Sequence, residues 1–181
     1  LVRKLRGAEA HALTMPLIIN KSTGRKFGKS EDGAVWLDAA KTSPYRFYQF
    51  WLNTDDLSVG QFLKIFTQLP RAEVESLLAE FGAAPQKRAA QRRLAGEVTA
   101  LVHGAETARR IAELSAVLFE DRNYQHLTEE DFKELKRDLP GIPVRPGETS
   151  LVEALIGCSL AASNSDARRL LNEGAVYLNG Q

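Results

Sequence analysis

Five consecutive residues, Lys26-Phe27-Gly28-Lys29-Ser30, have the types and the spacing needed to hold a polyphosphate. Two lysines stand three positions apart around a glycine. An ammonium group is a compact point charge that binds phosphate oxygens, and a glycine lets the backbone approach closely and lets a loop change shape. The pattern predicts a mobile phosphate-binding loop, although the same residue types are also typical of a solvated turn.

Spacing and context exclude a P-loop at this position. That motif needs two glycines separated by four residues, then Lys and Ser or Thr, and it must open a helix. Here only three residues separate Gly24 from Gly28. The segment that follows is Glu31-Asp32-Gly33 and then the strand-favouring Val35-Trp36-Leu37, so no helix is expected to begin there.

The elements around the loop are expected to belong to an α/β domain. Residues 1–7 are predicted to end a basic helix with Gly7 as its C-cap, and residues 15–19 to form a short buried strand. Residues 44–51 are rich in aromatic side chains. Their helical spacing favours a packed hinge between domains over a base-stacking surface.

From residue 57 to 139 the apolar residues follow helical spacing, which predicts a compact domain of five short helices. Capping boxes are expected at Ser58 with Gln61 and at Thr128 with Asp131. The third helix is predicted to run from Pro85 to His103. The predicted inward-facing residues are Val59, Phe62, Leu63, Phe66, Val74, Leu77, Leu78, Phe81, Leu94, Val98, Leu101, Val102, Ile111, Leu114, Val117, Leu118, Phe132, Leu135 and Leu139.

The last part of the chain begins with a linker. Residues 140–147 contain three prolines and two glycines. Two capped helices are predicted to follow, and then a strand before a hairpin turn. The signals are Ser150 with Glu153, Ser163 with Asp166, Gly174, Val176-Tyr177-Leu178 and Asn179-Gly180.

The loop and its flanks resemble the bacterial-type tyrosyl-tRNA synthetases. Lys26 to Ser30 matches the Lys-Phe-Gly-Lys-Ser/Thr form of the Lys-Met-Ser-Lys-Ser signature of class I aminoacyl-tRNA synthetases. The further resembling segments are 13–18, 35–38, 41–56, 85–95 and 101–104. Residues 167–170 and 174–176 resemble the RNA-binding module named after the fourth protein of the small ribosomal subunit.

The resemblance implies a mostly α chain with four parts. Residues 1–56 would be the C-terminal edge of a Rossmann-like α/β catalytic domain, with its signature loop and hinge. Residues 57–139 would be an α-helical anticodon-binding domain, and 140–148 a linker. Residues 149–181 would be a truncated α+β RNA-binding module of the ribosomal-protein type.

The resemblance also implies a reaction for the intact enzyme. It activates L-tyrosine with ATP, whose counter-ion is Mg²⁺, to tyrosyl-adenylate and then transfers the tyrosine to tRNA(Tyr). Negative charge grows on the departing pyrophosphate, and positive side chains aimed there lower the barrier. Lys26 and Lys29 are the expected catalytic residues, with Phe27, Gly28 and Ser30 completing the nucleotide-binding loop.

Seven residues are expected to contact RNA. Four cations lie within seven residues of the predicted third helix, a pattern that taken alone is typical of a solvated face. The resemblance favours phosphate contacts for them, which position an RNA more than they read its sequence. It also implies that Asp55 contacts an anticodon base. The full set is Asp55, Lys87, Arg88, Arg92, Arg93, Arg168 and Arg169.

Composition excludes several classes of protein and of binding site. Twenty-four Lys and Arg balance 23 Asp and Glu, so bulk charge (+1) carries no nucleic-acid signal. The single Cys158 excludes an internal disulfide framework, and the three histidines lack metal-ligand spacing. No apolar run is long enough to span a membrane. The resemblance implies a cytoplasmic homodimer whose interface lies mostly upstream of Leu1.

The chain starts at Leu1 rather than Met and ends just after a turn signal, which predicts that it is part of a longer polypeptide. The family's His-x-Gly-His motif does not occur in it, so we expect no tyrosyl-adenylate formation by this chain alone. Two alternatives stay open here. One is a non-catalytic RNA-binding protein on a synthetase scaffold, and the other is the tryptophanyl relative, which lacks the terminal module.

Overall fold

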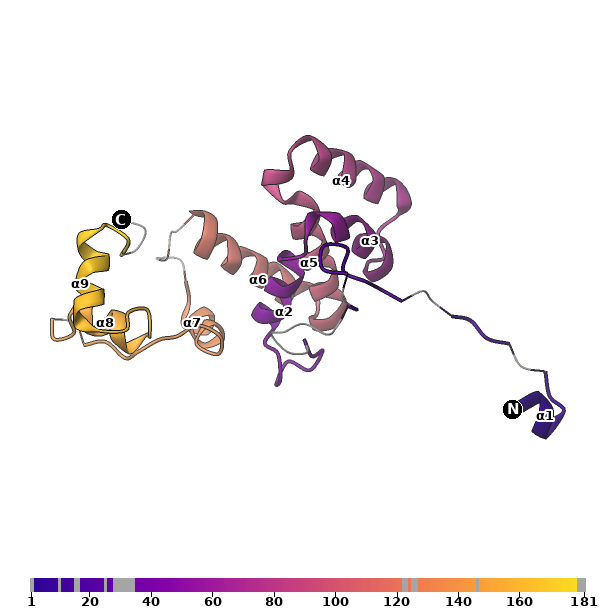
Figure 1. Ribbon diagram of the computed structural model, residues 1–181, viewed down its shortest axis with the longest axis horizontal. Coiled ribbons are helices and arrows are strands. Elements are labelled where there is room, and N and C mark those ends of the chain that lie inside the picture. Colours follow the sequence, from indigo (N-terminus) through magenta and orange to yellow (C-terminus); the bar gives the residue numbers. More distant parts are fainter. Residues whose placement is uncertain are drawn as a thin grey trace. The chain divides into compact units, whose positions relative to one another are not determined.

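The computed structural model describes residues 2–9, 11–14, 17–24, 26–27, 35–121, 124, 127–145 and 147–178 (Figure 1). The chain divides into two compact units, Leu1–Ala34 and Val35–Gln181. In the described residues the regular structure is helical, with one isolated antiparallel bridge and no strand. Gly28, Lys29 and Ser30, and the hairpin signal at Asn179-Gly180, lie outside the described residues.

The first unit begins with the short helix α1 (Val2–Arg6). Gly7 follows it with φ +64°, and its N–H donates to the carbonyl of Arg3 at 3.0 Å. A left-handed glycine that closes the last helical turn in this way is a common C-cap. The predicted end of a basic helix at Gly7 is therefore confirmed.

The strand predicted over residues 15–19 is wrong for the residues that the structure describes there. Residues 17–19 contribute only one bridge, between Ile19 and Lys26. Leu17 and Ile19 are 58% and 40% exposed, so the segment is not buried. A strand depends on neighbouring strands for its hydrogen bonds and its covered face, and the described residues supply none.

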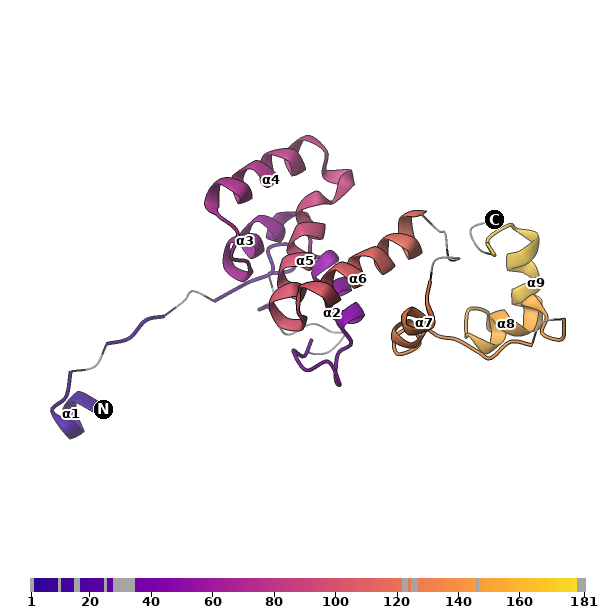
Figure 2. The same cartoon turned by 180° about the vertical axis from the view of Figure 1, so that it is seen from behind.

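The second unit is built around a central helix. Its elements are α2 (Pro44–Leu52), α3 (Asp56–Phe66), α4 (Arg71–Ala83), the 3₁₀ turn η1 (Pro85–Lys87), α5 (Ala89–His103), α6 (Ala105–Ala116), the π-helical turn η2 (Val117–Asp121), α7 (Glu129–Leu135), α8 (Leu151–Gly157) and α9 (Asn164–Asn172). Helix α5 contacts α2, α3, α4 and α6. Figures 1 and 2 view the molecule from opposite sides, and both show α2, α5 and α6 side by side. This arrangement buries one face of α5, whose Leu94 is fully inaccessible.

The aromatic residues of α2 are packed into this core. Tyr45, Phe47, Tyr48 and Trp51 are each at most 5% exposed. The Trp51 ring lies 4.9 Å from that of Phe66 on α3, measured between centroids. Rings that are covered in this way cannot stack on bases, so packing is confirmed as their role.

The N-cap of helix α3 lies three residues before the predicted cap. Asp55 is the N-cap, and its Oδ1 accepts a hydrogen bond from the N–H of Ser58 at 2.9 Å. Ser58 is fully buried inside the first turn, so the capping box predicted for Ser58 and Gln61 is wrong. Both Asp and Ser are good caps, and only the extended backbone of Asp55 decides between them.

Three residues predicted to point inward are exposed. Leu101 is 61% exposed because the buried face of α5 is centred on Gln91, Ala95 and Val98 and leaves Leu101 at its edge. Phe132 and Leu139 are 55% and 40% exposed. Helix α7 turns the face that carries Asp131 and Leu135 toward the rest of the unit, which leaves the Phe132 side out. The neighbouring predictions at Val59, Phe62, Leu63 and Leu94 are confirmed.

The C-terminal helices share a small core of their own. Leu155, Ala161 and Ala167 are buried, and partly buried apolar residues of α8, α9 and Val176 pack against them. The capping box of Ser150 and Glu153 is present as predicted. The strand predicted at Val176-Tyr177-Leu178 is absent, since no described segment lies beside it to accept its hydrogen bonds.

Part of the predicted linker is packed rather than free. The side chain of Ile142 lies against Gly157 of α8, where an added Cβ would come within 2.8 Å of Ile142 Cγ2. Arg145 N–H donates to Thr149 Oγ1 at 3.1 Å. Among the described helices, none is long and apolar enough to cross a membrane.

Candidate functional site

Lys26 and Phe27 of the signature loop stand at the end of a tight turn. The Asn20 side-chain oxygen accepts from the N–H groups of Ser22 and Thr23 at 3.0 and 2.9 Å, which is an Asx turn. Phe27 N–H donates to the carbonyl of Ile18 at 2.9 Å, so the backbone reverses between residues 20 and 24. The turn leaves Lys26 exposed. Gly28, Lys29 and Ser30 lie outside the described residues.

Asp55 and its neighbour Asp56 tie helices together. Asp55 caps α3, as described above. Asp56 Oδ1 accepts from Gln91 Nε2 at 2.6 Å, and Gln91 is fully buried on α5. This pair therefore forms the entry to α3, and the contact with an anticodon base stays a prediction for Asp55. The bond to Gln91 spans 35 positions, so local spacing gives no sign of it.

The four predicted cations near residue 90 lie at a break between two elements. The helix predicted from Pro85 is instead the turn η1 followed by α5, which begins at Ala89. Between them Arg88 has φ +52° and ψ 31°, the left-handed conformation. Its Nη2 donates to the backbone carbonyl of Leu52 at 2.6 Å. Arg88 therefore joins the start of α5 to the end of α2.

The other three cations differ in how they are held. Arg93 forms ion pairs with Glu73 of α4 at 2.6 Å and with Glu97 at 3.0 Å. Lys87 is exposed, and within the described part of the chain no carboxylate lies at ion-pair distance from it. Arg92 is also exposed, and its N–H donates to the carbonyl of Arg88 at 2.9 Å. Two of the four, Arg88 and Arg93, are thus bonded to distant parts of the chain.

The two predicted cations of α9 show the same contrast. Arg169 bonds to Asp166 and Glu173, both at 2.8 Å. The hydrogen bond to Asp166, followed by that to Glu173, holds the pKa of Arg169 above its usual value. Its neighbour Arg168 is exposed, with no carboxylate at ion-pair distance among the residues that the structure describes. Of these two arginines, only Arg168 has a charge that no described carboxylate partly neutralises.

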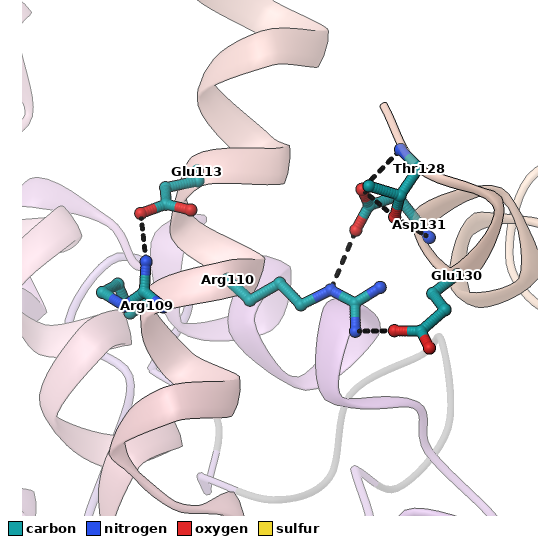
Figure 3. A network of polar contacts seen from close by, with 6 residues as sticks. All are labelled: Arg109, Arg110, Glu113, Thr128, Glu130 and Asp131. Carbon is teal, nitrogen blue, oxygen red and sulfur yellow. Dashed lines mark hydrogen bonds and ion pairs between the residues drawn. The ribbon is translucent and has the colours of Figure 1, made fainter. Parts of the chain in front are cut away.

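One polar network was not predicted. Arg110 of α6 donates from Nε to Asp131 Oδ1 and from Nη1 to Glu130 Oε2, both at 2.9 Å (Figure 3). Asp131 also accepts from the N–H and hydroxyl of Thr128 at 2.9 and 2.7 Å. Neighbouring Arg109 bonds instead to Glu113 within α6 at 2.8 Å. Arg110 and Asp131 are 21 positions apart, so no local spacing rule finds this pair.

Ionisation is shifted along this network. The hydrogen bond to Asp131 raises the pKa of Arg110. Burial acts to raise the pKa of Asp131, but the hydrogen bonds from Thr128 and from Arg110 outweigh it and hold that pKa below its ordinary value. Both shifts favour the charged pair. In the described residues no group of three or more His, Cys, Asp or Glu side chains is placed to hold a metal ion.

Two family models match the chain in order. The model described as tRNA synthetases class I (W and Y) matches residues 1–120, which is most of the chain. The chain belongs to this family. A second model, the Tyrosine--tRNA ligase SYY-like C-terminal domain, matches residues 131–181. The resemblance inferred from the signature loop and its flanks is thereby confirmed.

Two curated relatives agree with the family assignment. The chain is 46% identical to a tyrosine--tRNA ligase of Geobacillus stearothermophilus over 182 residues, covering 100% of the chain and 43% of that protein. It is 47% identical to tyrosine--tRNA ligase 1 of Bacillus subtilis over 97% of the chain and 41% of that protein. A C-terminally truncated mitochondrial tyrosyl-tRNA synthetase of Aspergillus nidulans matches at 36% identity and TM-score 0.48, over 50% of the chain and 25% of that structure. The chain spans less than half the length of these curated relatives.

Proposed function

We propose that this class I synthetase chain is the tRNA-binding part of a tyrosine–tRNA ligase. The intact enzyme would activate L-tyrosine with ATP and transfer it to tRNA(Tyr). The observation that carries the proposal is the identity of 46% along the whole chain to a protein named tyrosine--tRNA ligase. The match of residues 131–181 to a C-terminal domain of tyrosine enzymes favours tyrosine over tryptophan. The same match disfavours the alternative of a non-catalytic RNA-binding protein on a synthetase scaffold.

The proposed domains follow the resemblance. Residues 1–56 are the edge of a Rossmann-like catalytic domain with its hinge, and 57–139 form the anticodon-binding domain. Residues 140–148 connect it to an RNA-binding module of the ribosomal-protein type at 149–181. The intact enzyme would be a cytoplasmic homodimer that contacts itself through residues outside this chain.

The proposed chemistry assigns the loop to the activation step. The tyrosine carboxylate attacks the α-phosphate of ATP, and pyrophosphate leaves with its Mg²⁺ counter-ion. Lys26 and Lys29 place two ammonium groups on the leaving pyrophosphate, with Phe27, Gly28 and Ser30 completing the loop. Their contribution is electrostatic, because it grows as charge moves onto the leaving group.

The proposed RNA contacts fall into two groups. Lys87 and Arg168 have no carboxylate at ion-pair distance among described residues, so each can release a counterion on meeting a phosphate. The second group already bonds within the chain and consists of Arg88, Arg93 and Arg169. These residues would contact RNA only through the guanidinium N–H donors that their internal bonds do not use. Arg92 is exposed and is also proposed to contact a phosphate. Asp55 is proposed to meet an anticodon base from the start of α3.

The experiment is a binding titration of the purified chain with tRNA(Tyr) and with an unrelated tRNA at several salt concentrations. We expect tighter binding of tRNA(Tyr) and a linear fall of log affinity with log salt. We also expect no tyrosine-dependent exchange of pyrophosphate into ATP by this chain alone. Equal affinity for both tRNAs would overturn the proposal.

The loop is tested in the intact enzyme. Lys29→Ala and Lys26→Ala should slow tyrosyl-adenylate formation while leaving tyrosine binding unchanged, because the charge they neutralise develops only in the transition state. Weakened tyrosine binding with an unchanged activation rate would contradict the assigned role.

A further inference from the structure

Helix α7 is held to the rest of its unit mainly by polar contacts. At its N-terminal end, Glu130 and Asp131 bond to Arg110 of α6 (Figure 3). Just beyond its C-terminal end, Arg137 Nη2 donates to the carbonyl of Ala39 at 2.6 Å, and the Ser43 hydroxyl donates to Asp138. These four bonds are the α7 docking contacts. They join α7 to two segments that lie far from it in sequence.

Apolar burial contributes little to this attachment. Leu135 is the buried apolar residue of α7, at 6% exposure, while Phe132 and Leu139 remain 55% and 40% exposed. A helix that buries one large apolar side chain gains a small fraction of what the core helices gain. Ion pairs at a partly exposed surface are weakened by salt. The attachment of α7 is therefore weaker than the packing of α2, α5 and α6, and it depends on charge.

The connection beyond α7 is short. Asp138 is bonded to Ser43, and Ile142 packs against Gly157 of α8. Only residues 139–141 lie between these two anchors. When α7 is docked, the C-terminal helices are thus tethered by about three residues. If α7 were released, the tether would begin at the end of η2 near residue 121 and would be several times longer.

We propose that the α7 docking contacts form a charge-dependent switch that sets the length of the tether between the helical domain and the C-terminal module. Arg110 is its positioning residue. This inference rests on the proposed function for its consequence: a longer tether lowers the effective concentration at which α9 meets an RNA already bound by the helical domain. That fall is on the order of tenfold for the change in length.

The test compares two adjacent arginines of α6. Arg110→Ala removes the bonds to α7, while Arg109→Ala removes only the exposed pair with Glu113 and is the matched control. Hydrogen–deuterium exchange of the amides in residues 129–139 is measured for the whole chain. We expect about tenfold faster exchange there in Arg110→Ala and unchanged exchange in Arg109→Ala. Exchange in α5 should be the same in both variants.

Two further measurements test the switch independently. Molar salt should speed exchange in residues 129–139 of the unsubstituted chain and add little in Arg110→Ala. Trypsin should cut after Lys133, Lys136 or Arg137 sooner in Arg110→Ala than in Arg109→Ala. Should Arg110→Ala fold poorly, as judged by circular dichroism, Arg110→Gln removes the charge, keeps the side chain as far as Cδ, and gives the same comparison. Equal exchange in the Arg109 and Arg110 variants would overturn the switch.

The consequence for RNA is measured separately. Affinity for tRNA(Tyr) should fall on the order of tenfold in Arg110→Ala and stay unchanged in Arg109→Ala. Faster α7 exchange with unchanged tRNA affinity would overturn the proposed link between tether length and binding. A chain that binds no tRNA at all would contradict the proposed function, and the exchange data would still decide whether the switch exists.

Discussion

The guanidinium of Arg88 donates to the backbone carbonyl of Leu52 at 2.6 Å while Arg88 itself is held at φ +52°. The bond satisfies a carbonyl at the C-terminal end of α2, where helices leave such groups without an intrahelical partner. The left-handed backbone costs a non-glycine residue roughly 1–2 kcal/mol. One residue thus combines a favourable long-range bond with an unfavourable local conformation.

These two terms can be separated by substitution. Both Arg88→Ala and Arg88→Gly lose the bond to Leu52, but only the glycine relieves the backbone. We expect Arg88→Ala to lower the free energy of unfolding by about 1–2 kcal/mol. Arg88→Gly should be the more stable of the two variants by about 1 kcal/mol. Urea denaturation followed by circular dichroism measures both, and an alanine variant at least as stable as the glycine variant would contradict this account.

Ser159 is a second non-glycine residue with a left-handed backbone. It has φ +58° just after α8, is exposed, and donates its N–H to the carbonyl of Ile156 at 2.9 Å. A glycine can make this backbone bond without the steric cost of a Cβ. Ser159→Gly is expected to raise the free energy of unfolding by about 0.5–1 kcal/mol.

Ser165 is the matched control for Ser159. It is an exposed serine inside α9, where the backbone is helical. Ser165→Gly should lower the free energy of unfolding by about 0.5 kcal/mol, since glycine is a poor helix former. The opposite signs for the same chemical change, measured by thermal denaturation, test the assignment. Two changes of the same sign would contradict it.

The features that the sequence predicts well are local ones. Apolar periodicity places Val59, Phe62 and Leu63 in the core, and the spacing of Thr128 and Asp131 predicts the cap of α7. These signals work because side chains three or four positions apart share a helix face or meet at a helix end. The signature loop and its flanks likewise identify the family without reference to the fold.

The features that the sequence does not predict depend on distant partners. The bond from Arg110 to Asp131 and the bond from Gln91 to Asp56 span 21 and 35 positions. The orientation of α7, and with it the exposure of Phe132, follows from such contacts rather than from periodicity. For the candidate site, the sequence located Lys87 and Arg93 but could not tell that Arg93 is paired with Glu73.

The depressed pKa of Asp131 makes stability depend on acid pH. Burial alone would raise this pKa, but the hydrogen bonds from Thr128 and Arg110 favour the carboxylate and lower it from 3.8. The stabilisation is therefore fully present above pH 3.8 and is lost as the pH falls through the lower pKa of the folded state. Asp131→Asn removes this dependence and is expected to cost about 1–2 kcal/mol at pH 7.

The measurement is the free energy of unfolding in urea between pH 2 and pH 7. The difference between the unsubstituted chain and Asp131→Asn should shrink below about pH 4, where the unfolded chain takes up the proton. Glu129→Gln, an exposed carboxyl-to-amide change in the same turn, is the matched control for this substitution. A difference that is constant with pH would contradict the proposed charge contribution.

The contact between Ile142 and Gly157 predicts a background-dependent effect of one methyl group. An alanine Cβ at position 157 would lie 2.8 Å from Ile142 Cγ2, which is closer than such atoms approach. In a helix, Gly→Ala ordinarily stabilises by about 1 kcal/mol. We expect Gly157→Ala to be neutral or destabilising in the unsubstituted chain and stabilising by about 1 kcal/mol in an Ile142→Ala background. The double-mutant cycle, measured by denaturation, fails if the effect is the same in both backgrounds.

Under the proposed function, the pairing state of the exposed cations predicts which of them contribute most to RNA binding. Lys87 has no carboxylate at ion-pair distance among described residues, whereas the charge of Arg93 is already partly neutralised by Glu73 and Glu97. Lys87→Ala should therefore weaken tRNA(Tyr) binding several-fold and reduce the salt slope by about 1. Arg93→Ala should change the slope by much less.

Arg168 and Arg169 repeat this comparison on a second helix. Arg169 is bonded to Asp166 and Glu173, and Arg168 is exposed, so Arg168→Ala should reduce the salt slope more than Arg169→Ala. Binding is measured by fluorescence anisotropy at four salt concentrations, with thermal denaturation to confirm that every variant folds. If Arg93 and Arg169 dominate the slope instead, the internal ion pairs must open on binding, and the open cations are then not the main phosphate contacts.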